Sequence, residues 1–185
     1  IKELLACMQT IIYVKRNLRE YHNNVSRVSF EEALEHFTPE HSKCLASEPA
    51  YEEIRAKSFN LSPLLSYRSW FYKNRLFKED KRKTYIEGHR KRLEQHLIRL
   101  YRVRNEIIHE ARHNFNNEAL TSNLKYYLTF ALGIVIDHFH QYQGEQTALE
   151  DFFVLQSLKL SYLKKRAYPL ATLLDSDENF ELLNQ

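Results

Sequence analysis

The chain has 185 residues and a formal net charge of +3, which suit one domain with a buried core. Only three glycines and four prolines are present, and this scarcity excludes a turn-dense β fold. No apolar run approaches the ~20 residues that cross a bilayer, so we expect no membrane span. Cys7 and Cys44 lack a metal-type spacing, which predicts reduced thiols and a cytoplasmic protein.

Helical periodicity dominates the first half of the chain, where apolar side chains recur at three- and four-residue intervals. Serine residues mark three of the expected helix starts, since a serine side chain can accept a free amide hydrogen of the first turn. One serine begins a capping box with a glutamate three positions on, and two have a proline in the following turn. We therefore expect helices over 1–23, from Ser29 to before Thr38, after Ser47, and from Ser62 to about Phe77.

The second half of the chain contains the two longest helical patterns. One covers 84–113 and follows a charged stretch at 78–83, which reads as a connector or as an extension of the helix. The other covers 118–142 and is apolar nearly all round, which predicts the most buried helix of the fold. A capping box starts a last helix over 147–166.

These patterns predict an all-α fold, a helical bundle with extra short helices, because no alternating strand pattern is found. We expect one compact domain with three parts: an N-terminal helical part at 1–80, a core bundle at 81–168, and an acidic tail at 169–185. Ile1 already lies in a helical pattern, so we expect the chain to be a piece of a longer protein.

Positive charge is concentrated between Arg68 and Arg104, where thirteen Lys or Arg residues stand against four acidic residues. Beyond Leu170 there are four acidic residues and no Lys or Arg. A basic band on a balanced domain suits a phosphate backbone, although a solvated helix face gives the same count. We assign RNA contacts to four cations in and just after this band: Lys91, Arg99, Arg102 and Arg112.

The candidate catalytic residues lie near the end of the 84–113 pattern, in the segment RNEIIH from Arg104 to His109. Five residues turn a regular helix by about 500°, so these two side chains lie about 140° apart. Arg104 shares a stripe with Leu97 and Leu100, and a buried guanidinium is costly unless it meets an anion. That cost indicates a site. The spacing alone is weak, because Arg102 and several other arginines also closely precede a histidine.

The segment resembles the R-x4–6-H motif of the HEPN superfamily, in which a polar residue, often Asn, follows the arginine. Its surroundings, LYRVRNEIIHEA, are similar to the HEPN domains of prokaryotic defence and abortive-infection proteins, among them the ApeA-like group. The likeness covers residues 97–111. It implies an α-helical fold, a homodimer in which two motifs face each other, and RNA cleavage without a metal or other cofactor. It assigns the catalytic roles to Arg104, His109 and Asn105.

These residue types suit RNA cleavage, since RNA carries its own nucleophile in the 2′-OH. We expect His109 to transfer protons and Arg104 to bind the scissile phosphate, with Asn105 orienting one of them. The products would carry a 2′,3′-cyclic phosphate and a 5′-OH. One histidine cannot be base and acid at once, so a homodimer would supply the second. A toxin-like nuclease of antiviral defence would also need restraint by a regulatory domain or an antitoxin outside this chain.

Two other readings stay open. The segment from His109 to His113, HEARH, matches H-E-x-x-H, in which two histidines bind zinc and the glutamate acts as base. A third ligand, Glu145 or Glu150, would be needed, and Arg112 departs from the uncharged residues usual between the histidines. The other reading is a non-catalytic helical module that binds RNA, a nucleotide or a protein partner.

Overall fold

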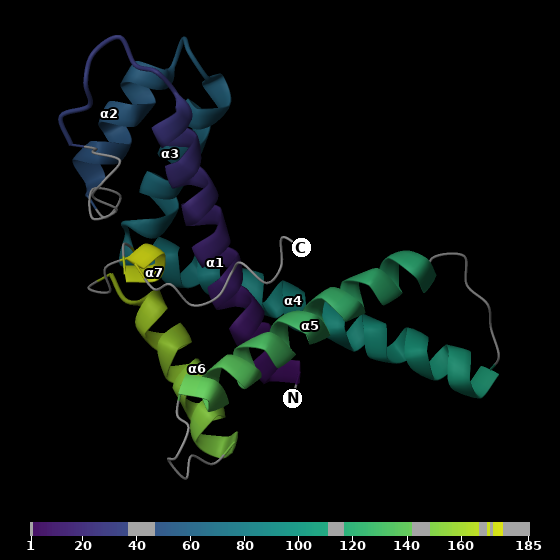
Figure 1. Cartoon of the computed structure of the whole chain (residues 1–185). Helices are drawn as coiled ribbons and strands as arrows, with labels where there is room; N and C mark the ends of the chain where they lie inside the picture. The colour runs from purple at the N-terminus through teal and green to yellow at the C-terminus, as the bar shows by residue number, and fades with distance from the viewer. Residues whose placement is uncertain are drawn as a thin grey trace. The chain divides into compact units, whose positions relative to one another are not determined.

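A computed structural model describes residues 2–36, 47–110, 117–141, 149–166, 170 and 172–175. All regular structure in these ranges is α-helical, with no strand, which confirms the predicted all-α class (Figure 1). The helices are α1 (Lys2–Arg27), α2 (Glu48–Ser58), α3 (Pro63–Leu76), α4 (Glu79–Glu110), α5 (Asn117–Gln141), α6 (Leu149–Lys164) and α7 (Thr172–Asp175). The capping box at Thr147 and most of the acidic tail lie outside the described residues.

The helices belong to two compact units. Unit 1 comprises residues 1–11 and 87–160, and unit 2 comprises residues 12–86 and 161–185. Three helices, α1, α4 and α6, therefore contribute residues to both units. The expected boundary at residue 80 lies close to the passage of α4 from unit 2 into unit 1. The start of α1, however, belongs to the same unit as the long helical patterns of the second half.

Serine caps fix the starts of two helices in unit 2. The side chain of Ser47 accepts the backbone N–H of Ala50, and that of Ser62 accepts the backbone N–H of Leu65. Each serine is followed by a proline in the first turn. Proline lacks an amide hydrogen, and in the first turn this costs no hydrogen bond because those amides have no partner within the helix. The predicted starts of α2 and α3 are confirmed.

Tyrosines form the centre of unit 2. Tyr21 of α1 stacks on Tyr51 of α2 with ring centroids 5.5 Å apart, and it meets the edge of Tyr72 of α3 at 5.2 Å. The hydroxyl oxygens of Tyr21 and Ser69 lie 2.7 Å apart, which satisfies a polar group inside this core. Burial raises the pKa of Tyr21, because the ionised phenol would lose its hydration. These rings join α1, α2 and α3.

Five of the six residues of the charged stretch, 79–83, form the start of α4 rather than a connector. Within it the Arg82 side chain is buried and donates hydrogen bonds to the backbone carbonyl oxygens of Leu76 and Lys165. Those carbonyls lie at the ends of α3 and α6, where the last turn of a helix leaves its oxygens without helical partners. Arg82 therefore serves the fold of unit 2 and is not part of a solvated basic face.

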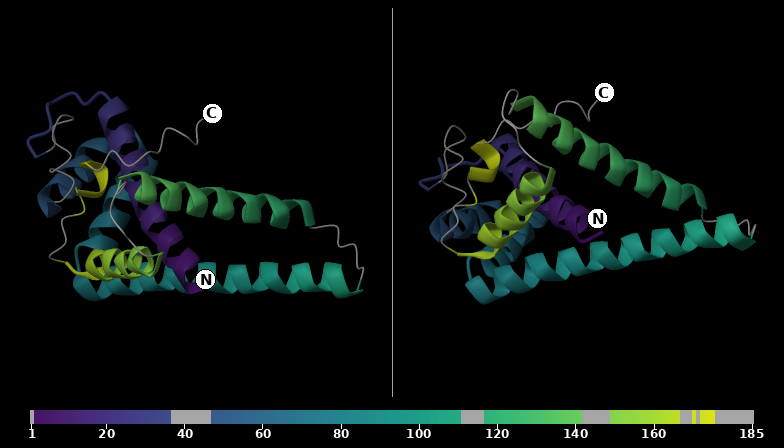
Figure 2. Two further views of the ribbon diagram at one scale, coloured as in Figure 1. Left: turned by 60° about the horizontal axis from the view of Figure 1, so that its bottom comes forward. Right: turned by 90° about the horizontal axis from the view of Figure 1, so that it is seen from below.

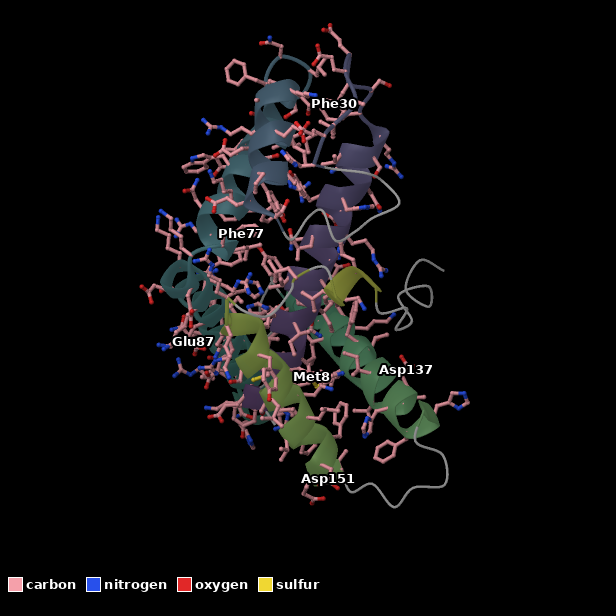
Figure 3. All side chains as sticks on the ribbon, turned by 90° about the vertical axis from the view of Figure 1, so that its left-hand side faces the viewer. Met8, Phe30, Phe77, Glu87, Asp137 and Asp151 are labelled. Atoms are coloured by element: carbon pink, nitrogen blue, oxygen red, sulfur yellow. The ribbon has the colours of Figure 1, made fainter. Side chains whose placement is uncertain are left out.

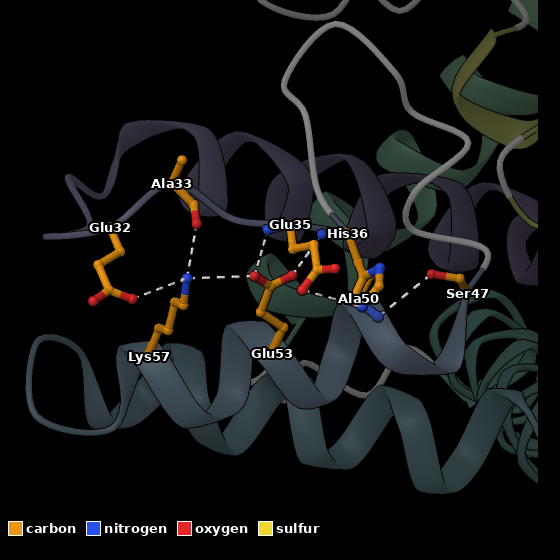
Figure 4. A network of polar contacts seen from close by, with 8 residues as sticks. All are labelled: Glu32, Ala33, Glu35, His36, Ser47, Ala50, Glu53 and Lys57. Carbon is orange, nitrogen blue, oxygen red and sulfur yellow. Dashed lines mark hydrogen bonds and ion pairs between the residues drawn. The ribbon is translucent and has the colours of Figure 1, made fainter.

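The helix predicted from the capping box at Ser29 does not form over residues 28–36, and the prediction is wrong there. Figure 4 shows what replaces it: a polar network with α2. The Glu53 carboxylate accepts the backbone N–H groups of Glu35 and His36. In a helix, those two amides would donate to backbone carbonyl oxygens of the same segment. Their hydrogen bonds to α2 therefore outweigh the local capping signal.

Unit 1 has a small core that joins α1, α5 and α6. Met8, Ala131 and Phe152 form its buried centre, and Met8 is labelled in Figure 3. The Gln9 side-chain amide donates to the carbonyl oxygen of Tyr127 at 3.4 Å, which links α1 to α5 a second time. The first three turns of α1 thus hold α5 together with α6.

The prediction that α5 is the most buried helix is wrong. Only Phe130 and Ala131 are buried among its described side chains, whereas Leu132 and Ile136 are 59 % and 64 % exposed. In Figure 2, the end of α4 and the start of α5 extend beyond α6 and the start of α1, their partners in unit 1. Those partners cover one side of α5, and its other apolar side remains exposed.

Replacing Glu53 by Gln should destabilise unit 2 by ~1 kcal/mol at neutral pH, because a charged acceptor of two amides is lost. Burial of the Glu53 carboxylate opposes ionisation, but the two amides and the Lys57 ammonium 3.4 Å away outweigh it, so its pKa is lowered. A lowered folded-state pKa contributes stability above the unfolded pKa, and this contribution is lost as pH falls through the folded pKa. Urea unfolding at neutral and acidic pH measures both effects.

Glu31→Gln is the matched control, since Glu31 is exposed on the same segment. It should leave the free energy of unfolding unchanged at either pH. An equal loss of stability in Glu53→Gln at neutral and acidic pH would contradict the role assigned to the carboxylate charge.

Candidate functional site

The three predicted catalytic residues lie in the last two turns of α4. Arg104 and His109 are exposed and Asn105 is half-buried. The helix continues through Glu110, so within the described residues no break in α4 turns His109 toward Arg104. The expectation that Arg104 lies on a buried stripe is wrong, because Leu100 is the last buried side chain of α4.

The structure joins Arg104 to Asn105 and leaves His109 apart. The Arg104 Nη1 atom donates to the Asn105 side-chain oxygen at 3.1 Å, a neutral partner that does not compensate the positive charge. No hydrogen bond or ion pair in the described part of the chain links His109 to either residue. Since α4 is regular here, the arginine and histidine side chains leave the helix about 140° apart.

His109 shares its helix face with two of the predicted RNA-binding cations. Lys91 precedes it by eighteen residues, which is about five full turns, and Arg102 precedes it by seven, which is about 20° short of two turns. Both cations are exposed, as is the nearby Arg99. The fourth predicted cation, Arg112, lies outside the described residues. One face of α4 thus combines an exposed imidazole with positive charge.

Arg104 lies on a different and more apolar face of α4. Tyr101 and Ile108, three residues before it and four residues after it, are 62 % and 56 % exposed. Residues at these spacings are neighbours on a helix surface. The Arg104 guanidinium is therefore flanked by apolar groups that the described part of the chain leaves in contact with solvent.

Ion pairing divides the cations of α4 into two groups. Arg90 is held between Glu87 and Glu94, with nitrogen–oxygen distances of 2.7 and 3.2 Å. By contrast, no carboxylate among the described residues pairs with the arginines of the last three turns, which are Arg99, Arg102 and Arg104. The basic band seen in the sequence is thus partly neutralised, and the three arginines near the end of α4 belong to its unpaired part.

The three histidines of α4 have different environments. His89 is half-buried, and burial, with a smaller effect from Arg92, lowers its pKa to about 4, so it is neutral at physiological pH. His96 is also half-buried and packs its ring edge against Tyr127, with centroids 5.8 Å apart. Only His109 is exposed. Among these histidines it is the one that a dissolved substrate can reach.

The zinc reading of the HEARH segment concerns residues that are only partly described. His109 is described, whereas His113 and one suggested third ligand, Glu145, lie outside the described residues. Glu150, the other suggested ligand, is exposed at the start of α6. The described residues contain no group of three His, Cys, Asp or Glu side chains that could hold a metal ion.

Comparison of the chain with protein-family models, curated proteins and solved structures found no match. The site is therefore defined by its own geometry. Sequence reasoning placed the motif at the end of a long helix, but it missed the exposed apolar neighbours of Arg104. The signal was available, because Tyr101 and Ile108 occur at helical spacing around the arginine.

Proposed function

We propose that the chain is a metal-independent endoribonuclease of the HEPN type, acting as a toxin in antiviral defence. His109 transfers protons to and from the reacting oxygens, and Arg104 stabilises the charge that develops on the phosphate. Asn105 holds the guanidinium in place through its side-chain oxygen. The 2′-OH of the RNA attacks the adjacent phosphorus and the 5′ oxygen leaves. The products are a 2′,3′-cyclic phosphate and a 5′-OH end.

The observation that carries this proposal is the charge arrangement at the end of α4. Three exposed arginines, Arg99, Arg102 and Arg104, have no carboxylate partner in the described chain, and they lie in the same last three turns of α4 as the exposed His109. An arginine that already had a carboxylate partner would bind a phosphate only by losing that partner. Among the described residues, no carboxylate competes with a phosphate for these arginines, and the same end of the helix carries an exposed imidazole.

The geometry of α4 supports the proposal of a homodimer. One regular helix holds Arg104 and His109 on different faces, so a site that uses both needs a residue from a second copy or an RNA that wraps around the helix. The apolar surface of unit 1 suits a second copy. Large exposed apolar side chains recur every four residues along α5, namely Leu124, Leu128, Leu132 and Ile136. Helix α6 also has exposed apolar residues, Val154 and Leu158. Unpaired apolar surface of this kind favours association.

A membrane is the competing use of the same surface. By length and composition alone, residues Glu118–His140 of α5 could cross a bilayer, a test that core helices of soluble proteins also pass. Lys125 and Asp137 lie within this segment, and a charged group inside a bilayer is costly. Self-association is therefore the use that we propose.

Replacing His109 by Ala should abolish cleavage of single-stranded RNA, because no other exposed histidine of α4 can replace the lost proton carrier. The measurement is the cleavage rate of a labelled oligoribonucleotide, with analysis of the product ends. His140→Ala, an exposed histidine on α5, is the control and should leave the rate unchanged. Addition of EDTA should not slow the wild type. Absence of cleavage by the wild type, or complete inhibition by EDTA, would refute the proposal.

Arg104 and Arg102, two described arginines of the same helix end as His109, should respond differently. Arg104→Ala should lower kcat about 100-fold, because a group that stabilises transition-state charge is lost. Arg102→Ala should mainly raise KM, since Arg102 shares the cationic face of His109 and contacts the RNA backbone. Steady-state kinetics on one oligoribonucleotide separate the two parameters. A larger loss of kcat in Arg102→Ala than in Arg104→Ala would show that the wrong arginine has been assigned to the phosphate.

A double substitution on α5, Leu132→Glu with Ile136→Glu, should convert a dimer into a monomer and reduce cleavage with it. In the monomer the new carboxylates are solvated, whereas in a dimer they would be buried in an apolar interface against like charges. Association would therefore cost free energy. Sedimentation velocity measures the mass, and the cleavage assay measures activity. Leu61→Glu in unit 2 is the control, because Leu61 is also exposed but lies far along the chain from α5. A monomeric wild type that cleaves RNA would contradict the composite site.

A further inference from the structure

The outer face of α3 carries large exposed side chains instead of the charged residues usual on a solvated helix. Leu64, Tyr67 and Trp70, spaced three residues apart, are 67 %, 57 % and 43 % exposed. Phe59, in the turn before this helix, is 68 % exposed. The opposite face of α3 is buried in the tyrosine core of unit 2, so the helix does not need these residues for its own packing.

The rings on this face form a continuous row. Tyr67 lies between Trp70 and Phe71, with centroid distances of 5.8 and 6.2 Å, and it is tilted from each by little more than 30°. Phe71 in turn lies beneath the Arg75 guanidinium, whose central carbon is 5.8 Å from the ring centroid. Flat groups with modest mutual tilt are suited to stacking against further flat groups.

The same region has an unusual charge. From Ile54 to Lys78 the sequence contains six Lys or Arg residues and no acidic residue. Four of the six, Arg55, Lys57, Arg68 and Lys73, pair with glutamates outside this stretch. Arg75 and Lys78, at the end of α3, are exposed and have no carboxylate partner in the described chain. The row of rings therefore ends at uncompensated positive charge.

We propose that this face of α3, defined by Leu64, Tyr67, Trp70, Phe71 and Arg75, binds single-stranded RNA. Bases stack on Tyr67 and Trp70, and the phosphate backbone passes Arg75 and Lys78. Stacking requires unpaired bases, so a duplex of the same length is excluded. The uncompensated positive charge of Arg75 and Lys78 beside the rings favours a polyanion over an apolar partner helix. The surface shares no residue with the proposed nuclease site and does not depend on it.

The fluorescence of Trp70 gives a direct test, because it is the only tryptophan of the chain. The probe is a twelve-residue oligouridylate with 2′-O-methyl groups, which the proposed nuclease chemistry cannot cleave, added to the full chain at low salt. Stacking should quench and saturate the Trp70 emission, and the same titration in His109→Ala should give the same curve. Raising the salt concentration should weaken the binding, as phosphate contacts require. The matching 2′-O-methyl duplex should not quench.

Tyr67→Ala should weaken the binding about 10-fold, the effect of losing one stacked base. Arg75→Gln should reduce the dependence of log Kd on log salt by about one contact. Tyr162→Ala is the matched control, since Tyr162 is an exposed tyrosine beside a lysine on α6, and it should bind like the wild type. Circular dichroism shows that each variant is folded.

Three results would overturn the proposal. If the single strand did not quench the Trp70 emission, stacking of bases on Trp70 would be ruled out. Equal binding of the duplex would indicate a purely electrostatic contact. Self-association of the chain that Tyr67→Ala abolishes would show that this face is a protein interface. Because the readout is Trp70 emission, an inactive nuclease site leaves the expected result unchanged, and failure here leaves the nuclease proposal intact.

Discussion

The unbroken helical geometry of α4 is the constraint on which the proposed chemistry depends. A helix that continues to Glu110 fixes the directions of Arg104 and His109 about 140° apart, and no side-chain rotation removes that difference. Each face then has its own character. The imidazole shares its face with Arg102 and, about five turns away, with Lys91, whereas the guanidinium is flanked by exposed Tyr101 and Ile108. A site built from both groups has to be completed from outside the single helix.

The exposed apolar surface of unit 1 has the same physical origin. Its core is small, centred on Met8, Ala131 and Phe152, and it uses only one side of α5. The remaining apolar side of α5 costs free energy in water, roughly in proportion to its exposed area. A second copy that covered this side would lower that cost and could bring a second His109 to the RNA. Stability and catalysis would then depend on the same association.

The helices could be predicted from local signals wherever local and tertiary preferences agree. Ser47 and Ser62 cap their helices as expected, and the all-α class follows from periodicity alone. The capping box at Ser29 was misleading, because Glu53 on another segment takes the amides of Glu35 and His36. A sequence window contains no information about such a distant competitor.

Burial was less predictable than helicity, and this limited the prediction of the site. The apolar pattern of α5 identifies a surface that avoids water, but it does not say whether the chain itself or a partner covers that surface. The same ambiguity affected Arg104, which shares a stripe with buried Leu100 yet is exposed near the end of α4. The position of the motif on the helix was predictable. The placement of Arg104 and His109 on two different faces follows from their five-residue spacing once α4 is known to stay regular.

The central claim, that two His109 residues act in one composite site, is tested most directly by mixing. Wild-type and His109→Ala chains are co-refolded at constant total concentration and assayed for RNA cleavage. If each active site needs both imidazoles, the rate should fall as the square of the wild-type fraction. A rate that falls in direct proportion to that fraction would show that one His109 is enough for each site, and it would contradict the account.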